Sequence, residues 1–410
     1  MATIRERYVA VAASVALAGS IGIAASANVA AAAPSIAPSV AAASAPSAPS
    51  AKRLTTKKVN YCSTLTKKQR TTLKKQLRAK RLTNKQCSAK ARSLKITAQK
   101  AAAKKPAPTP TPAPAPAPTP AVFGMSANGE TALKAAETAI GLKAGVVGVF
   151  ADFKHEFPAQ DAAYAAARGA SLMISWEPWD WEVKSQTQPA YTLDQVAAGT
   201  YDTYIRTFAQ AAAATARPVF IRFAAEMNGD WQVWSTGANS NGPGDYIAAY
   251  RHVVDVSRAA GGTNIKWVFN PIVSYEGSTP LTQLYPGDSY VDWVALDGYN
   301  WGALKWGWQS FTDVFTMGLK EIKAIAPGKP LAIAEIGCTP GTGKAAWVTD
   351  SFAKAQAAGA RMLVWFEHNK ETDWRLSSDA QVAAAAKTAA TQPGWVSGGD
   401  YNKVKAALGL

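Results

Sequence analysis

The chain has 410 residues, 48% of them hydrophobic, and carries a formal net charge of +16. That charge would suggest a polyanion-binding protein. However, 19 Lys and Arg lie between residues 51 and 105, where there is no Asp or Glu, and the chain beyond is mildly acidic. The composition therefore argues against nucleic-acid binding by the larger part of the chain.

Residues 1–33 have the pattern of an export signal. Arg5 and Arg7 form a short positive region, and an apolar run follows from Tyr8 to about Ala25. Small residues up to residue 33 then offer A-x-A cleavage sites. We expect a cleaved signal and a secreted protein with no membrane span after cleavage. The alternative is an uncleaved membrane anchor.

Residues 34–120 precede the main domain and divide into three parts. Residues 34–50 are low-complexity Ala/Ser/Pro sequence, residues 51–105 are the basic segment, and residues 106–120 form a Pro/Thr linker of the kind that acts as a semi-rigid spacer. Leucines at roughly helical spacing predict a small helical module in the basic segment. Cys62 and Cys87 could close it with a disulfide.

Two functions are open for the basic segment. It is either a solvated spacer or a module that binds an anionic cell-wall polymer. Nucleic acid is not expected as a partner, because no aromatic residue except Tyr61 interleaves its cations. The third cysteine, Cys338, lies far along the chain, and there is no CxxC motif or metal-ligand spacing. We therefore expect neither a metal nor a cofactor.

From residue 121 onward, short apolar runs alternate with longer amphipathic stretches. Continuous apolar runs are typical of strands buried on both faces, and eight such units predict a (β/α)8 TIM barrel over residues 121–392, with 393–410 as a C-terminal tail. The rival fold is an open doubly wound sheet, but no Gly-rich phosphate turn follows the first strand. The eight runs are Val122–Met125, Val146–Phe153, Ser171–Trp176, Val219–Ala224, Ile265–Asn270, Val291–Leu296, Leu331–Ala334 and Met362–Phe366.

Carboxylates and tryptophans follow these runs, where the C-terminal ends of barrel strands would form the mouth. Sugar rings stack their C–H faces on aromatic rings, and glycosidic bond cleavage needs two carboxyl groups that flank one bond. Glu226 after the fourth run and Glu335 after the seventh would face each other across the mouth. The pattern predicts a glycosidase.

Three stretches resemble signatures of glycoside hydrolase family 26, in the right order. Arg222-Phe-Ala-Ala-Glu226-Met-Asn-Gly-Asp-Trp231-Gln-Val-Trp234 is similar to its fourth-strand motif, Val291-Asp-Trp-Val-Ala-Leu-Asp-Gly-Tyr299-Asn-Trp301 to its sixth, and Pro330-Leu-Ala-Ile-Ala-Glu335 to its seventh. Asp152 and Trp176-Glu-Pro-Trp179 also resemble family positions.

The resemblance implies a secreted, endo-acting, retaining enzyme on a β-linked polysaccharide. Glu226 would be the acid/base and Glu335 the nucleophile, with Tyr299 hydrogen-bonded to the nucleophile and Arg222 keeping it ionised. Trp365 would form the floor under the sugar at the cleavage site. The substrate-binding residues expected on this basis are Asp152, Trp176, Trp179, Asn228, Trp231, Trp234, Trp301 and Trp365.

One position departs from the family pattern. Family members usually carry His directly before the acid/base, expected to contact substrate, whereas this chain has Ala225. We expect β-1,4-mannan as the substrate, with mixed-linkage β-glucan or β-1,3-xylan as alternatives. A catalytically silent carbohydrate- or cell-wall-binding protein is the alternative of another class, against which the retained Glu pair argues.

Overall fold

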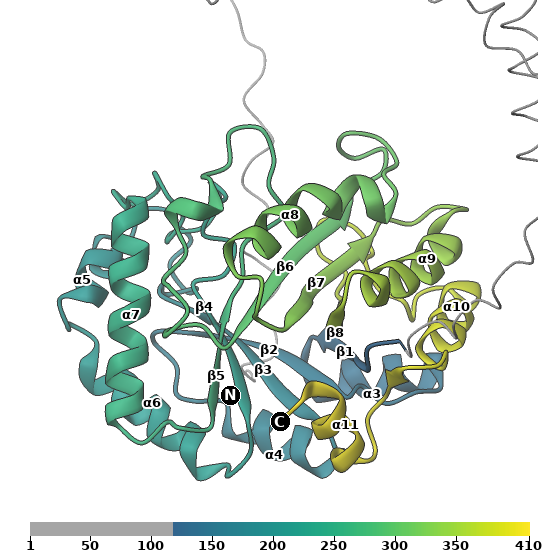
Figure 1. Cartoon of the computed structure of the whole chain (residues 1–410), viewed down its shortest axis with the longest axis horizontal. Coiled ribbons are helices and arrows are strands. Elements are labelled where there is room, and N and C mark those ends of the chain that lie inside the picture. The colour runs from purple at the N-terminus through teal and green to yellow at the C-terminus, as the bar shows by residue number, and fades with distance from the viewer. Residues whose placement is uncertain (1–117) are drawn as a thin grey trace, which may run out of the picture. The chain divides into compact units, whose positions relative to one another are not determined.

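A computed structural model describes residues 118–410, which fold into a closed barrel with helices around it (Figure 1). All strand pairs are parallel, and β1 pairs with both β8 and β2, which closes the sheet. The (β/α)8 prediction is confirmed, and closure excludes the open doubly wound sheet. The strands are β1 (Ala121–Ala127), β2 (Val146–Asp152), β3 (Ser171–Glu177), β4 (Val219–Phe223), β5 (Ile265–Phe269), β6 (Trp293–Asn300), β7 (Leu331–Cys338) and β8 (Ala360–Glu367).

The helices between the strands are amphipathic and pack their apolar faces on the outside of the barrel. All eight apolar runs overlap strands. Residues 193–214 form two helices, because Gly199 between them adopts a left-handed φ of 86°. The helical elements are α3 (Gly129–Ile140), α4 (Ala159–Ala167), η2 (Pro189–Tyr191), α5 (Leu193–Ala197), α6 (Asp202–Ala214), α7 (Pro243–Ala259), η3 (Leu281–Gln283), α8 (Phe311–Ile325), α9 (Lys344–Ala357) and α10 (Ala380–Ala390).

Two separate apolar clusters show which way each strand residue faces. The larger joins the strands to the surrounding helices. The smaller fills the barrel interior and includes Val122, Phe220, Trp293 and Val364. Because successive strand residues point to opposite faces, membership in one cluster fixes the direction of its neighbours. The interior is apolar until Arg222, which lies two residues beyond Phe220 on β4.

The segment 393–410, expected as a tail, is built into the barrel. The short strand β9 (Trp395–Val396) pairs with the start of β1, and helix α11 (Tyr401–Leu408) contributes Val404 and Leu408 to the interior cluster. Asp400 caps α11 by accepting from the backbone N–H groups of residues 402 and 403. The helix therefore closes the barrel at the N-terminal ends of its strands and leaves the opposite end as the mouth.

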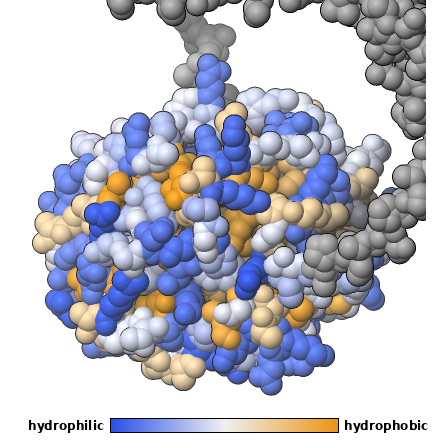
Figure 2. All heavy atoms as spheres, viewed as in Figure 1, coloured by the Kyte–Doolittle hydropathy of each residue, from blue (hydrophilic) through white to orange (hydrophobic). Residues whose placement is uncertain are grey.

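Within residues 118–410 no helix is long and apolar enough to cross a bilayer. Hydrophobic residues on the face drawn in Figure 2 form separate patches among hydrophilic ones. The predicted signal, the basic segment with its Cys62–Cys87 pairing, and all of the linker up to residue 117 lie outside the described residues. Cys338 is a buried free thiol.

Candidate active site

A buried arginine organises the centre of the barrel mouth. The Arg222 side chain is 2% exposed, and its Nη2 lies 2.6 Å from Glu335 Oε1 and 3.2 Å from Asp297 Oδ2. Burial alone would lower the pKa of Arg222, but the two carboxylates raise it above its ordinary value. Arg222 is therefore a permanent cation between two acids, and it holds the Glu335 carboxylate in one orientation.

A bulge in β7 turns Glu335 toward Arg222. Ile333 faces the helices, and so does Ile336, although residues three apart on a regular strand face opposite sides. β7 therefore has one more residue than β6 at this point: Leu296 pairs with Ile333, whereas the next residue, Asp297, pairs with Glu335. Such a bulge re-aims side chains. Arg222 Nη1 donates to the carbonyl of Ala334 at 3.2 Å, so the arginine also anchors the bulged residue.

Tyr299, from the end of β6, contacts the other oxygen of Glu335. Its hydroxyl donates to Oε2, while Arg222 holds Oε1. Burial and the nearby Glu335 carboxylate raise the pKa of Tyr299 well above its usual value. The phenol thus stays a neutral donor, and both oxygens of Glu335 are fixed.

Glu226 lies in a strained turn directly after β4. Ala224 and Glu226 have φ values of 48° and 59°, a region that costs energy for residues other than glycine. The turn is held from both sides: Ala224 N–H donates to the Trp176 carbonyl at 3.0 Å, and Glu226 N–H to the Asn270 carbonyl at 2.8 Å. The ends of β3 and β5 therefore fix the direction of Glu226.

The motif after Glu226 explains the position of Trp231. A Cβ at Gly229 would lie 2.6–2.8 Å from the Trp231 ring atoms, so glycine there lets the indole fold back over the loop. Trp231 Nε1 then donates to Glu226 Oε2 at 2.8 Å, and the ring stacks on Tyr275 with centroids 6.1 Å apart. Both rings are more than a third exposed. They form an aromatic wall beside Glu226.

The two glutamates are close together but electrostatically different. One oxygen from each of Glu226, Asp297 and Glu335 lies within 4.8 Å of the others. Burial, and then the Glu335 charge, raise the pKa of Glu226 to about 7, against the opposing effects of the Trp231 hydrogen bond and Arg222. Glu226 can therefore hold a proton near neutral pH while Glu335 stays paired with a cation. Such a pair suits acid and nucleophile roles.

The three carboxylates could in principle ligate a metal ion, but Arg222 already supplies the positive charge to two of them. Asp297 is fully buried, and burial raises its pKa well above the usual range despite the Arg222 charge. Two carboxyl groups that are already paired with the same arginine are a poor donor set for a metal ion. The geometry favours proton transfer and nucleophilic chemistry.

Glu177, at the end of β3, adds a fourth carboxyl group to the mouth. It is half-buried and accepts from Trp179 Nε1 at 2.9 Å. Burial raises its pKa to about 8, although the Trp179 hydrogen bond opposes this shift. Trp179 itself is 8% exposed, with an edge-to-face contact to Trp234 at 5.9 Å. At neutral pH, Glu177 can donate a hydrogen bond as a neutral acid.

Three of the predicted substrate-binding tryptophans are in the wrong place for that role. Trp176 is fully buried and stacks on Phe208 of α6, Trp234 is 1% exposed, and Trp365 is fully buried against Trp347 of α9. On β8, Met362 and Val364 face the interior, so Trp365 must face the helices. The predicted sugar floor at Trp365 is therefore wrong.

The polar side chains of two predicted substrate-binding residues also already form hydrogen bonds within the protein. Asp152 is fully buried and accepts from the backbone N–H groups of residues 154, 155 and 181, as well as lying 2.6 Å from His155 Nδ1. Asn228 is 1% exposed and bridges to Ile272, donating to its carbonyl and accepting from its N–H. Both hold loops of the mouth in place instead of presenting free groups to a ligand.

Trp301, the remaining predicted aromatic contact, is half-buried beside Tyr299. The Lys305 ammonium lies 4.3 Å from its ring centroid, and Trp374 contacts it at 4.9 Å. Trp374 is also 5.0 Å from Tyr299, and Trp365 Nε1 donates to its backbone carbonyl. Sequence reasoning missed Trp374 because it lies in an irregular loop after β8, where no periodicity shows its direction.

Asp297 and Tyr275 were likewise not selected from the sequence. Asp297 could have been found, because it lies two residues before Tyr299 on β6 and so shares its face. Tyr275 follows β5, which has no carboxylate at its end, and only the folded loop brings it to Trp231. Glu367, by contrast, is structural: it accepts from the backbone N–H groups of residues 376 and 377.

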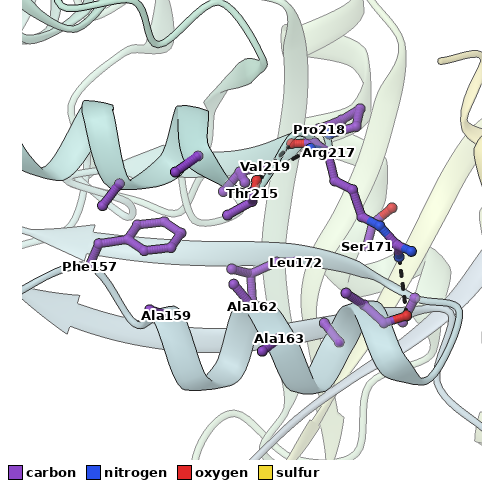
Figure 3. A pocket seen from close by; sticks show the side chains of 15 residues that line it. Phe157, Ala159, Ala162, Ala163, Ser171, Leu172, Thr215, Arg217, Pro218 and Val219 are labelled. Atoms are coloured by element: carbon purple, nitrogen blue, oxygen red, sulfur yellow. Dashed lines mark hydrogen bonds between the residues drawn. The ribbon is translucent and has the colours of Figure 1, made fainter.

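A pocket elsewhere does not compete with this site. It lies between α4, α6 and the starts of β3 and β4, and Figure 3 shows Phe157, Ala162, Leu172 and Arg217 among the side chains that line it. No carboxylate lines it. Alanines in both helices leave this space because their side chains are short, so the pocket is a packing feature remote from the mouth.

Comparisons with known proteins agree with this geometry. The model of glycosyl hydrolase family 26 matches residues 168–380. Endoglucanase H of Acetivibrio thermocellus is 38% identical over 273 residues, 63% of this chain and 29% of that protein. Mannan endo-1,4-beta-mannosidase A and B of Caldalkalibacillus mannanilyticus is 30% identical over 175 residues, 38% of this chain and 30% of that protein. A beta-1,3-xylanase of Alcaligenes sp. is 34% identical over 107 residues, 25% of this chain and 21% of that protein. The chain thus matches less than a third of the length of each relative.

Solved structures share the fold at lower identity. A beta-mannanase of Bacteroides ovatus superposes with a TM-score of 0.53 at 17% identity, covering 70% of this chain and 92% of that one. A modular endo-beta-1,4-mannanase of Cellulomonas fimi gives a TM-score of 0.53 at 22% identity, covering 70% and 74%. These two structures agree with the barrel described above.

Proposed function

The chain belongs to glycosyl hydrolase family 26, and from that premise we propose that it is an endo-acting glycoside hydrolase that cleaves a β-linked glucan by double displacement. The observation that carries the proposal is the Glu226–Glu335 pair, whose nearest oxygens lie within 4.8 Å. Retaining glycosidases hold their two carboxyl groups about 5–5.5 Å apart, whereas inverting enzymes leave about 6.5–9.5 Å for a water.

Each step of the reaction has a residue suited to it. Glu335, oriented by its ion pair with Arg222, attacks the anomeric carbon while Glu226 gives its proton to the leaving oxygen, so that a covalent glycosyl–enzyme forms. Water then attacks the same carbon, Glu226 takes its proton, and Glu335 is released. Two inversions leave the β configuration unchanged. Tyr299 donates a hydrogen bond to Glu335 Oε2 in the free site and is placed to keep contact with this carboxyl group during both steps.

The preference for glucan over mannan has two supports. The relative with the longest match quoted above, 38% identical over 273 residues, is named an endoglucanase, while the quoted mannosidase is 30% identical over 175 residues. In addition, Ala225 stands where the family resemblance predicts a histidine that contacts the sugar. It is 5% exposed and offers no side-chain hydrogen bond. Mannan, expected from the sequence, becomes the second candidate.

Substrate choice can be tested by reducing-end release from lichenan, β-mannan and β-1,3-xylan. We expect the largest kcat/KM on lichenan. Ala225→His should move the lichenan-to-mannan ratio toward mannan, because it restores a donor near the cleavage point, and a hydroxyl-specific donor discriminates strongly. The same thermal unfolding midpoint for both proteins would show that the fold is intact. An unchanged ratio would contradict a role for position 225, and no release from any of the three would refute the enzyme proposal.

The alkaline limb of the pH–rate profile should report Glu226. Because the acid must be protonated at the start of the reaction, kcat/KM should fall as pH rises through the pKa of about 7. Trp231→Phe removes a hydrogen bond that favours ionised Glu226 and should therefore move this limb to higher pH. Tyr275→Leu removes the stacked partner but keeps that hydrogen bond, so its limb should stay in place. A limb unmoved by Trp231→Phe would argue against Glu226 as the acid.

We further propose that the enzyme acts after export. The Arg5/Arg7 region and the apolar run that follows support this, as does the size of a polymeric substrate, which cannot reach an enzyme inside the cell. Fractionation of an expressing culture, with N-terminal sequencing of the recovered protein, tests it. Activity confined to the cell interior would contradict export.

A further inference from the structure

A short hairpin after β6 carries an unusual share of exposed apolar surface. Seven large hydrophobic side chains are exposed within the described residues, and three of them lie between residues 304 and 308. Leu304 is 56%, Trp306 72% and Trp308 48% exposed. Burying such rings is favourable, so leaving two indoles in water is a cost that calls for a ligand.

The hairpin is held rigidly. Gly302 and Gly307 form an antiparallel bridge, and the buried Asn300 Oδ1 accepts from both the Gly302 and the Gln309 N–H groups at 3.1 Å. Trp306 has a φ of 59°, which is rare for a bulky residue. Strain of this kind persists where the surroundings enforce it, as they do at binding sites. The indoles are therefore displayed in a preset geometry.

Trp308 lies on a floor built from glycines of the β7–α9 loop. A Cβ at Gly343 would come within 2.8 Å of the Trp308 ring, and one at Gly341 within 3.3 Å. Glycine at both positions lets the indole pack on the loop backbone while it remains 48% exposed. Two loops of the mouth thus fix the orientation of the Trp308 ring. A hydrophobic residue that is exposed by chance would not need such support.

The hairpin is continuous with the reaction centre. Tyr299, which donates to Glu335, is 6.3 Å from Trp301, and Trp301 is 6.5 Å from Trp306 in an edge-to-face contact. Lys305 lies over both Trp301 and Trp306, at 4.3 and 5.7 Å. A line of aromatic rings therefore leads from Glu335 out to the exposed hairpin, on a different wall from Trp231 and Tyr275.

We propose that Trp306 and Trp308 form a distal sugar-binding subsite that stacks on a ring of the polysaccharide beyond those at the cleavage point. This inference rests on the proposed function. An uncharged β-linked chain fits because its rings offer flat C–H faces, and because it can occupy the cleavage point and the hairpin at the same time. The subsite adds affinity only for chains long enough to reach it.

Binding is best measured without turnover, in a Glu335→Ala background, by calorimetry with a glucan disaccharide and hexasaccharide and by gel retardation in lichenan. Trp306→Ala should weaken hexasaccharide binding about tenfold, the size expected when an anchoring aromatic is lost, and should leave disaccharide binding unchanged. Trp306→Tyr, which keeps a stacking ring, should restore most of the affinity. Trp308→Ala should act in the same direction.

Met317→Ala is the matched control, because Met317 is 58% exposed on α8 and outside the hairpin; it should bind like the parent. Equal hexasaccharide affinity of the parent and Trp306→Ala, or an equal loss for the disaccharide, would overturn the subsite. If the wild type hydrolyses none of the glycans but Trp306→Ala still weakens hexasaccharide binding, the subsite stands and the proposed activity fails. No binding of any glycan by the parent would refute both.

Discussion

Replacing Glu335 by alanine should lower kcat at least about 10⁴-fold, because the variant has no group to form the glycosyl–enzyme. The fold should survive, since Arg222 keeps Asp297 as a buried partner. The measurement is kcat on an aryl β-glucoside oligomer with an activated leaving group, alongside circular dichroism. Residual activity within tenfold of the wild type would contradict the assignment of the nucleophile.

The stereochemistry of the product formed with azide distinguishes the roles of the two glutamates. In Glu335→Ala it can occupy the vacated space and attack the anomeric carbon directly, which gives the α-glycosyl azide after one inversion. In Glu226→Ala the glycosyl–enzyme still forms on Glu335 when the leaving group needs no proton, and azide then displaces Glu335 to give the β-glycosyl azide. Proton NMR distinguishes the products. The opposite pairing of products and variants would exchange the two roles.

Arg222→Met should destabilise the protein by about 3–5 kcal/mol at pH 7, because it leaves Asp297 and Glu335 buried without their cation. It should also abolish most activity, since Glu335 would lose the ion pair that orients its carboxylate. Burial already raises the pKa of Asp297 above its unfolded value of about 4, and the variant removes the cation that opposes this shift. The penalty should therefore grow as pH rises above about 4 and shrink at lower pH, where protonation removes the buried charges.

Urea unfolding at pH 7 and pH 4 measures this difference. Arg217→Met is the matched control, because Arg217 is partly exposed, packs over the Tyr401 ring at 4.2 Å and donates to the Ala166 carbonyl; it should cost about 1 kcal/mol or less at both pH values. Arg222→Lys keeps the charge but cannot reach two carboxylates and the Ala334 carbonyl together. An equal loss for Arg222→Met at both pH values would show that the loss is due to packing and not to charge.

The β7 bulge shows where a strand pattern stops being informative. The run Leu331–Ala334 was identified correctly as a strand, but its alternation would have aimed Glu335 at the helices. An extra residue on β7 changes this, and the Arg222–Ala334 hydrogen bond that anchors it joins residues 112 apart in sequence. A contact between residues so far apart in sequence cannot be predicted from the local pattern of apolar residues.

The aromatic residues also fall into two groups: those whose position a local motif predicts and those whose position depends on the folded structure. Trp231 could be linked to Glu226 from the spacing of the motif, with Gly229 between them. Trp365 could not be oriented, because the direction of a side chain on β8 depends on how that strand pairs with β1 and β7. Trp306 and Trp308 have no periodic context at all, and their exposure is set by a hairpin held by Asn300 and by the glycines of a neighbouring loop.

The sequence by itself determined the eight buried strands, their order and the position of the two glutamates at the ends of β4 and β7, because these features depend on local hydrophobic runs and on short motifs. Through the family resemblance, the sequence also predicted that Tyr299 and Arg222 would act on Glu335. The tertiary structure alone decided the other contacts: Arg222 with Asp297, and the two exposed indoles with the outer end of the aromatic line. These contacts depend on strand register and loop packing between distant segments, where burial and charge pairing outweigh local preference.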